Sequence, residues 1–508
     1  MATGDMTGRR HAGFDRQLAW LLFAFFSCFY LSSAKGLLEH GDDVSMFLVT
    51  QSMVEHGNSS VPADSPGAAP GADGRWYSKY GIGQSALAIP LYLVGRTLER
   101  LSPVKPVVRG DEGLVRASIP IYVVSLLGVF CTAATVALLF LTCRLLGCAE
   151  MASLAAALAL GAGTFAWHYA RSFMSEPASM LALLLAVYAS LRSLGFSAVA
   201  GRTGLHRWLV ISGAAAGVAV LIRAANVVAL LPLGVWLLWA WWRAEPRWKP
   251  MLGKAVSWGL PVAAAFAGMF LYDYVRFAAS GETGYGGELY GGFSTPLHVG
   301  LFGLLLSPGK SIFLYAPILL ACTKGWRILR RTQPAVFVLL AAMALAQLVF
   351  HARWYMWWGG GTWGPRFLVV VLPFLLVGLA LRLHQGVTRA EGLGLSLLAL
   401  FSFLVQVVSV LVPYVPYEGK MEATAESFDR LLWNPADSPV LAHARSLLNR
   451  EFPLDLAPSV CRCWPATAVQ LAALVACVLI GWRAIKLCRT VASDREPTRD
   501  QANLPGVG

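Results

Sequence analysis

Two adjacent aspartates stand out in the stretch EHGDDVSMFLVTQSMVEHGN, which follows the first strongly apolar segment of the chain. An ionised carboxylate can take a proton from a hydroxyl group, so Asp42 and Asp43 are candidate general bases. An aspartate can also simply cap a helix by accepting hydrogen bonds from its first backbone amides. Capping explains one of the two more easily than both, because adjacent carboxylates repel each other. We therefore expect Asp42 to cap a short helix and Asp43 to be the base.

Cationic side chains recur beside aromatic residues at the ends of the apolar segments. Arginine and tryptophan commonly anchor helix ends at a membrane surface, which accounts for any single one of them. A converging set also suits a phosphate group, because guanidinium grips phosphate oxygens in a fork. The segments WHYARSFMSEP, LIRAANV and HARWYMWWGGGTWGPRF supply the candidate phosphate ligands Arg171, Arg223, Arg353 and Arg366 and the candidate pocket residues His168, Glu176 and His351.

Lys310 differs from these arginines because it lies inside the apolar segment 299–322. A charged residue within a span is costly and usually functional. Pro308 and Gly309 precede it and predict a broken helix that lines a cavity. The alternative is a lysine that pairs with a neighbouring helix. The string SPGKS is not a nucleotide-binding loop, since Leu304 stands where that motif needs glycine.

One carboxylate and several cations suffice for the transfer of a group from a phosphate to a hydroxyl. A phosphate departs without a general acid, and arginine or lysine stabilises the charge that develops on it. The accepting hydroxyl needs a base, which the carboxylate supplies. The residues therefore suggest glycosyl transfer from a lipid-phosphate sugar.

The elements that position these residues are membrane helices. The chain of 508 residues is 56% hydrophobic and 14% charged, whereas soluble domains carry about 25% charged residues. A spanning helix needs roughly 20 apolar residues, and apolar segments of that kind recur along the whole chain. The net charge of +13 is assigned to topology and not to nucleic-acid binding, because lysine and arginine set the orientation of a multi-span protein.

The apolar segments predict an all-α polytopic membrane protein with about twelve spans. A thirteenth segment, 81–98, is ambiguous. If it does not span, the loops richest in lysine and arginine fall on the cytoplasmic side, together with both termini, as the positive-inside rule requires. Residues 81–98 then form a juxtamembrane helix. The predicted spans are 17–34, 117–143, 150–167, 177–194, 208–222, 224–242, 255–277, 299–322, 334–351, 366–384, 392–413 and 466–487.

This topology divides the chain into two parts. Residues 1–385 form the predicted catalytic module, with 35–116 as a long external loop that holds juxtamembrane helices. Residues 386–508 add further spans, a second external loop at 414–465 and a cytoplasmic tail. Both aspartates and the arginines then face the extracytoplasmic side.

The order of these segments, with RWYSKYGIGQSALAIPLYLVG in the first loop, resembles the GT-C superfamily of polyprenyl-phosphate-sugar-dependent glycosyltransferases, which includes protein O-mannosyltransferases and aminoarabinose transferases. The resemblance covers roughly residues 17–385. It implies a GT-C-like bundle, inversion at the anomeric carbon, and a general base or metal contact at Asp42 or Asp43. The family's loop lysine matches Lys79, next to Tyr80, although Gly81 stands where the family has proline. By the same resemblance, other family positions match Arg171, Glu176, Arg223 and Arg366.

The partners implied are a polyprenyl-phosphate-sugar donor, membrane lipids, and an acceptor that is a glycan, a lipid or a protein. Some members use a divalent metal such as Mg²⁺ or Mn²⁺, whose ligands here would be Asp42 and Asp43. A bacterial inner or plasma membrane is the expected location. Two alternatives stay open: a transporter or flippase, and a polysaccharide polymerase or ligase that uses lipid-pyrophosphate donors.

Overall fold

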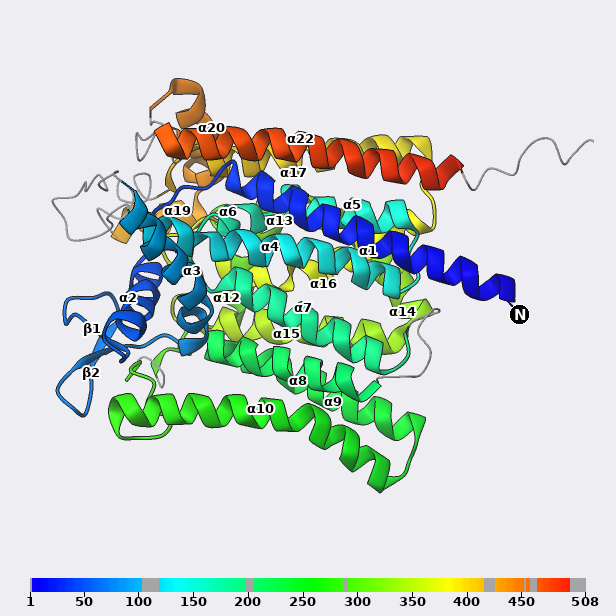
Figure 1. Ribbon diagram of the computed structural model, residues 1–508. Helices are drawn as coiled ribbons and strands as arrows, with labels where there is room; N and C mark the ends of the chain where they lie inside the picture. Colours follow the sequence, from blue (N-terminus) through cyan, green and yellow to red (C-terminus); the bar gives the residue numbers. More distant parts are fainter. Residues whose placement is uncertain are drawn as a thin grey trace, which may run out of the picture.

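The protein is an all-α polytopic membrane protein whose long helices run side by side in one bundle (Figure 1). The computed structural model describes residues 2–102, 118–196, 205–286, 291–414, 425–451, 454–456 and 464–493. Within these residues, seven helices are long and apolar enough to cross a membrane, and three shorter helices are also apolar. The seven are Ile119–Leu145, Ala224–Ala244, Trp248–Phe277, Pro334–Arg353, Arg366–His384, Arg389–Leu411 and Thr467–Arg489.

Each of the twelve predicted apolar segments coincides with a helix, while the number of crossings remains a prediction. Eleven segments form one main helix each, and 299–322 is interrupted. The main helices are α1 (Ala2–Leu31), α4 (Ile119–Leu145), α5 (Glu150–Gly163), α7 (Glu176–Ser193), α8 (Leu205–Ile222), α9 (Val227–Ala244), α10 (Trp248–Phe277), α15 (Pro334–Arg353), α16 (Leu372–His384), α17 (Arg389–Leu411) and α22 (Trp464–Ser493). Short helices join them: α6 (Ala166–Ala170), η1 (Ala224–Asn226), α14 (Cys322–Thr332) and η3 (Arg366–Val371).

The interruption in the predicted span 299–322 lies where Pro308 and Gly309 indicated it. Helix α12 (Leu297–Leu306) ends before Ser307, and the chain continues as α13 (Ile312–Tyr315) and η2 (Pro317–Ala321). Ser311 caps α13 by accepting from two backbone amides. The hydroxyl of Ser307 and the amide of Gly309 both donate to the carbonyl of Leu432, which belongs to α19 (Ala425–Trp433). The backbone groups freed by the break are thus partly satisfied by a segment that is remote in sequence.

Two helices lie across one end of the bundle instead of along it. They are α2 (Gly41–Glu55) and α3 (Ile82–Leu101), and Figure 1 shows them at the end opposite to the N-terminus of α1 and the final turns of α22. Between them a small antiparallel sheet forms in the order β1-β3-β2, from Ser60–Val61, Ala68–Pro70 and Trp76–Ser78. The short elements η4 (Pro435–Asp437) and α20 (Pro439–Asn449) follow α19.

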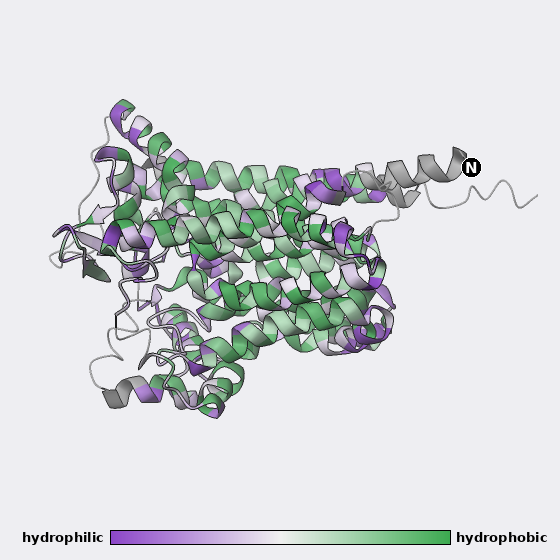
Figure 2. Cartoon of the chain, turned by 90° about the horizontal axis from the view of Figure 1, so that it is seen from below, coloured by the Kyte–Doolittle hydropathy of each residue, from purple (hydrophilic) through white to green (hydrophobic). Residues whose placement is uncertain are grey.

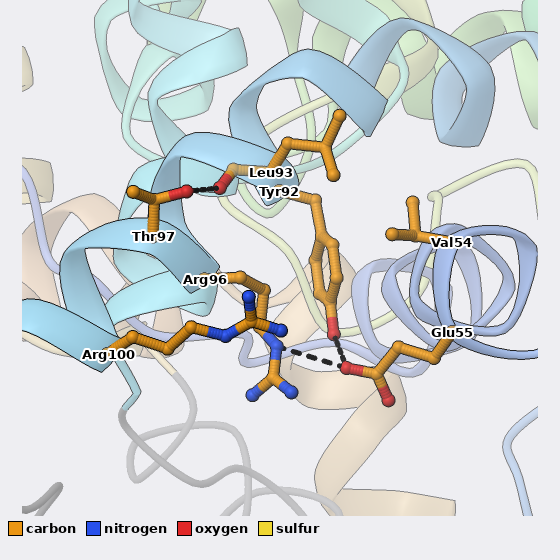
Figure 3. A pocket seen from close by; sticks show the side chains of 7 residues that line it. All are labelled: Val54, Glu55, Tyr92, Leu93, Arg96, Thr97 and Arg100. Atoms are coloured by element: carbon orange, nitrogen blue, oxygen red, sulfur yellow. Dashed lines mark hydrogen bonds and ion pairs between the residues drawn. The ribbon is translucent and has the colours of Figure 1, made fainter.

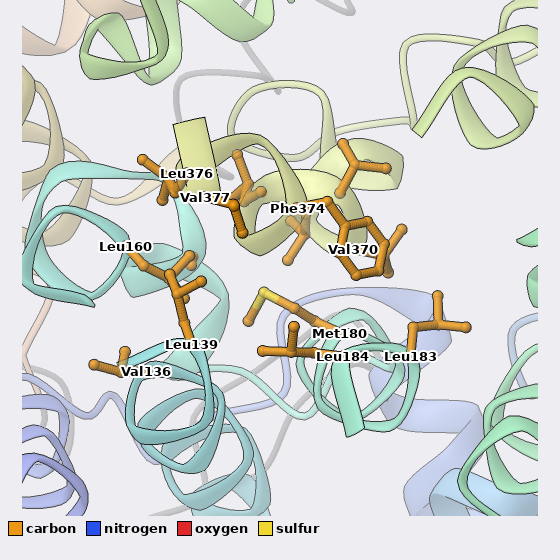
Figure 4. Packing of buried hydrophobic residues seen from close by; sticks show 14 of the residues in the cluster. Val136, Leu139, Leu160, Met180, Leu183, Leu184, Val370, Phe374, Leu376 and Val377 are labelled. Atoms are coloured by element: carbon orange, nitrogen blue, oxygen red, sulfur yellow. The ribbon is translucent and has the colours of Figure 1, made fainter. Parts of the chain in front are cut away.

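The core is apolar and packs helix against helix. Figure 4 shows Leu139 of α4, Leu160 of α5, Leu184 of α7 and Phe374 of α16 converging. Glycines bring some helices closer still. A Cβ atom at Gly213 would lie 2.1 Å from the carbonyl oxygen of Trp258, so the GAAAG stretch of α8 packs directly on α10, as small residues do between membrane helices.

Hydrophobic residues fill the length of the bundle, while hydrophilic ones gather at its two ends (Figure 2). Large apolar side chains are exposed along the outer helices, among them Leu231, Val235, Leu260 and Leu271. An apolar belt between two polar ends is what a bilayer requires of a spanning protein. The end that carries α2 and α3 holds the residues discussed next.

Candidate active site

The first turn of α2 carries both aspartates. The N-cap is His40, with no side-chain capping bond, and the helix begins at Gly41. The expectation that Asp42 caps this helix is therefore wrong, because the helix starts one residue earlier than the capping argument assumed. Both carboxylates lie in the first turn, where the helix dipole favours negative charge.

Asp42 is the partly accessible member of the pair, with 27% of its side chain exposed. It accepts a hydrogen bond of 2.6 Å from the Tyr80 hydroxyl and lies 3.0 Å from Nη2 of Arg366. Burial opposes ionisation of Asp42, but the charge of Arg366 and the bond from Tyr80 outweigh it and hold the pKa of the carboxyl below its ordinary value. Asp42 is thus an ionised carboxylate that faces a cation.

Asp43 lies behind Asp42 and is 1% exposed. Neither of its carboxylate oxygens has a hydrogen-bond partner among the described residues. Its Oδ2 atom lies 3.7 Å from Nδ1 of His40. Burial raises the pKa of Asp43 to about 6, although the imidazole partly opposes this. At a pH of about 6, the Asp43 carboxyl is therefore about half-protonated.

Alternating charges extend from Asp42 into the bundle. Arg366 contacts Asp42 on one side, and its Nε lies 3.8 Å from Oε1 of Glu176. The same Glu176 oxygen lies 2.6 Å from Nη1 of Arg223. We call Asp42, Arg366, Glu176 and Arg223 the charged chain. Its members come from α2, η3, the start of α7 and the residue before η1.

The ring of Phe367 supports both arginines of the charged chain. The guanidinium carbon of Arg223 lies 4.6 Å from the ring centroid and that of Arg366 lies 5.0 Å from it. His351 stacks against the same ring at 4.6 Å with an interplanar angle of 23°. A cation over an aromatic face is stabilised by the ring quadrupole. Phe367 therefore fixes where the two cations point.

Lys79 directly precedes Tyr80 in the sequence. Its ammonium group lies 4.8 Å from the centroid of the Tyr285 ring. Tyr80, the following residue, donates to Asp42. The structure thus brings Lys79 to the end of the bundle where the charged chain begins.

Arg171 belongs to a different group of charges. Its Nε donates to the carbonyl of Ser33 at 2.5 Å, and its Nη2 lies 3.4 Å from the carboxylate of Asp455. Lys35 lies 2.6 Å from Asp455 and 2.6 Å from Glu39. This buried ion cluster joins three segments that are remote in sequence, and it engages Nε and Nη2 of Arg171, while Nη1 has no hydrogen-bond partner among the described residues.

Lys310 contacts the loop between α15 and η3. Its ammonium donates to the carbonyls of Gly360 and Thr362 at 3.1 and 2.5 Å. On the same loop, the carbonyl of Gly361 accepts from Nε2 of His40 at 3.0 Å. The sequence predicted that Lys310 lines a cavity or pairs with a neighbouring helix, and in the structure its ammonium donates to the loop that leads to Arg366.

Two other predicted residues lie outside the charged chain. Arg353 is exposed and donates to the carbonyl of Phe293. His168 is buried, with Nδ1 3.2 Å from the carbonyl of Ser409 and its ring stacked on Trp363.

Sequence reasoning missed His40, Phe367, Lys35 and Asp455. His40 stands three residues before Asp43, a spacing that places both on one side of a helical turn. Phe367 follows Arg366 directly. Nothing in the sequence pointed to Asp455, because its partners come from remote parts of the chain.

A shallow groove of about 460 Å³ opens beside α2 and α3 (Figure 3). Its lining includes Glu55, which accepts from Tyr92 and lies 3.1 Å from Nε of Arg96. The groove is lined by Val54, Glu55, Tyr92, Leu93, Arg96, Thr97 and Arg100. It contains no member of the charged chain.

The described residues contain no group of three or more His, Cys, Asp or Glu side chains that could hold a metal ion. The two oxygens of Asp42 already contact Tyr80 and Arg366. Divalent Mg²⁺ or Ca²⁺ prefers several oxygen ligands, so Asp42 and Asp43 alone do not make such a site. We therefore route no chemistry through a metal.

No family model matches this chain, and no curated protein matches it. Among solved structures it is similar to ArnT from Cupriavidus metallidurans bound to undecaprenyl phosphate, with 15% identity, a TM-score of 0.51, and coverage of 93% of this chain and 77% of that chain. It is also similar to the oligosaccharyltransferase of Archaeoglobus fulgidus in the apo form, with 11% identity, a TM-score of 0.48, and coverage of 83% and 60%. The likeness to ArnT shows a shared fold, and the GT-C-like bundle expected from the sequence is confirmed at that level.

Proposed function

We propose that this protein is a GT-C-type glycosyltransferase that moves a sugar from a polyprenyl-phosphate donor to an acceptor hydroxyl. The observation that carries the proposal is the pair formed by Asp42 and Arg366, a partly exposed base against a cation, with Arg223 beyond Glu176. The fold is one in which ArnT is seen bound to undecaprenyl phosphate, and this supports a lipid phosphate as the ligand of the arginines.

The reaction needs one bond to form and one to break. The acceptor oxygen attacks the anomeric carbon and gives its proton to the aspartate. The bond from that carbon to the phosphate oxygen breaks, and the phosphate leaves with the electron pair as polyprenyl phosphate. Attack from the opposite face inverts the anomeric centre. Arg366, Arg223 and Lys79 stabilise the charge on the leaving phosphate.

The pairing of Arg366 with Asp42 gives this reaction an order. While the two are in contact, Arg366 lowers the pKa of Asp42 and makes the carboxylate a weak base. A donor phosphate competes for the same guanidinium, since phosphate accepts its forked hydrogen bonds. When Arg366 turns to the phosphate, Asp42 loses its counter-charge and becomes more basic. The base is then activated by the arrival of the donor.

We assign the base to Asp42 rather than to Asp43, which the sequence favoured. A general base has to reach the hydroxyl whose proton it takes. Asp42 is 27% exposed and lies against the phosphate-binding arginine, whereas Asp43 is 1% exposed. Asp43 then acts behind it, as a buried acid that shapes the local charge.

The test is release of polyprenyl phosphate by purified protein with a panel of polyprenyl-phosphate sugars. We expect Asp42→Asn to lower the rate by about 10²–10⁴-fold, as loss of a general base does, and Asp43→Asn to lower it much less. Asp64→Asn, in an exposed position of the same loop, is the matched control. Full activity in Asp42→Asn would remove the base assignment.

The same panel addresses the two alternatives. A polymerase or ligase would use lipid-pyrophosphate donors and ignore the monophosphates. A transporter or flippase would move lipid across a vesicle without cleaving it. A charged Lys310 within a span was the feature that favoured a transporter. Its ammonium donates to the carbonyls of a loop, so it gives this alternative less support.

A further inference from the structure

Helix α15 carries two buried polar residues one turn apart, Gln347 and His351. They are 1% and 4% exposed. Residues four apart lie on the same side of a helix, so both side chains occupy one face near the end of α15. That face packs on η3, which carries Arg366 and Phe367.

Three polar atoms of this pair have no hydrogen-bond partner among the residues that the structure describes. They are Nε2 and Oε1 of Gln347 and Nε2 of His351. Nδ1 of His351 lies 2.9 Å from the carbonyl oxygen of Gln347. A carbonyl only accepts, so Nδ1 carries the proton and the neutral ring presents an acceptor at Nε2. The pair thus offers one amide donor group and two acceptors.

The pair is one aromatic ring away from the charged chain. His351 stacks on Phe367, and the guanidinium carbons of Arg223 and Arg366 lie 4.6 and 5.0 Å from that ring's centroid. A donor whose phosphate binds these arginines has its sugar directly attached to that phosphate. The sugar therefore lies within the neighbourhood of Phe367 and the α15 face.

Buried polar groups without partners are rare in native proteins, and each calls for an explanation such as a ligand or a bound water. They are especially costly inside a membrane helix, where bulk water cannot replace the missing bond. A phosphate offers acceptors alone and cannot satisfy the two acceptor atoms. A lipid tail offers neither donors nor acceptors. Sugar hydroxyls offer both.

We propose that Gln347 and His351, beside Phe367, form a subsite for the hydroxyl groups of the donor's sugar. This rests on the proposed function, because it takes the lipid phosphate to lie on Arg223 and Arg366. Gln347 donates and accepts, and His351 accepts through Nε2. The subsite accordingly distinguishes a glycosylated lipid phosphate from the bare lipid phosphate that leaves as product.

The experiment compares the binding of undecaprenyl phosphate with that of undecaprenyl phosphate carrying a hexose or a pentose, without any acceptor. Wild type should bind its preferred sugar-bearing lipid at least tenfold more tightly than the bare lipid phosphate. Gln347→Leu and His351→Phe should remove most of that preference and change binding of the bare lipid phosphate by less than twofold. Met343→Leu, at a buried position one turn before Gln347 on α15, should keep the preference.

A preference that survives both substitutions overturns the subsite, and so does an equal loss of binding for both lipids. Failure of wild type to bind either lipid overturns the proposed function instead. A second readout needs no ligand: Gln347→Leu should raise the apparent melting temperature by a few degrees, because it removes an unpartnered buried amide. A lowered melting temperature would mean that the amide is bonded within the fold, and would also overturn the subsite.

Discussion

The charged side chains that the sequence singled out divide into those that face one another in the site and those that contact other groups elsewhere. The sequence pointed to Asp42, Glu176, Arg223 and Arg366 by their chemistry and to Tyr80 through the family resemblance, and the structure brings them together. It could not separate them from Arg171 and Lys310, which look equally suited to a phosphate. The difference lies in their partners, Asp455 and the carbonyls around Gly360, and a single sequence does not show which remote segments meet.

At this scale Asp43 makes stability depend on pH. Its pKa is about 6 in the folded protein, against 3.8 for the free side chain. The folded state holds the proton more tightly, so the stabilisation is complete below pH 4 and is lost as the pH rises through 6. The shift corresponds to roughly 3 kcal/mol, at about 1.4 kcal/mol per unit. We expect Asp43→Asn to raise the apparent melting temperature at pH 7.5 and to raise it only about a third as much at pH 4.5, measured by thermal unfolding in detergent. An equal change in melting temperature at both pH values would show that the Asp43 carboxyl does not titrate between pH 4.5 and pH 7.5.

Among the elements, the helices were predictable and the small sheet was not. Apolar segments of spanning length predicted every main helix, and Pro308 with Gly309 predicted the break before α13. The strands β1, β2 and β3 have two or three residues each, too few for an alternating pattern to be read. Strands β1 and β2 lie in NSSVPADSPGAAPGADG, a stretch rich in glycine, proline and alanine that is typical of a connector.

The loop between α15 and η3 shows how an element positions a side chain. Gly359 has a φ of 83°, and a Cβ atom there would lie 2.8 Å from Cγ of Arg366. Gly386 also has a φ of 83° but has nothing within 4 Å of such an atom. Alanine at either position meets the same left-handed strain, about 1–2 kcal/mol. We expect both variants to lose similar melting temperature, and Gly359→Ala alone to lose about tenfold or more in turnover, because it displaces Arg366. Equal turnover in the two would mean that the loop does not set this arginine.

For the whole molecule, the two polar ends of the bundle are predicted to face opposite sides of the membrane. The structure places α2 and α3 at one end and the outer turns of α1 and α22 at the other (Figure 1). The basic loops predict that the second end is cytoplasmic. The exposed positions Asp64 and Gln385 lie in loops of opposite predicted sides. We expect an impermeant thiol reagent to label Asp64→Cys in intact cells, in a background with Cys461 and Cys463 replaced by serine, and Gln385→Cys only after permeabilisation. The reverse pattern would invert the proposed topology.

The buried ion cluster can form only late in the synthesis of the chain. Arg171 and its partner Asp455 are 284 positions apart in the chain, and Lys35 is more distant still from the same carboxylate. In a chain synthesised from its N-terminus, Lys35 and Arg171 are present long before Asp455 has been synthesised. Until then the two cations lack the carboxylate that they share in the finished protein. The segment that carries Asp455 therefore completes the contacts of the cluster. A nascent chain that stops short of it already contains every residue of the charged chain but lacks the ion pairs that join the segments of Lys35 and Arg171.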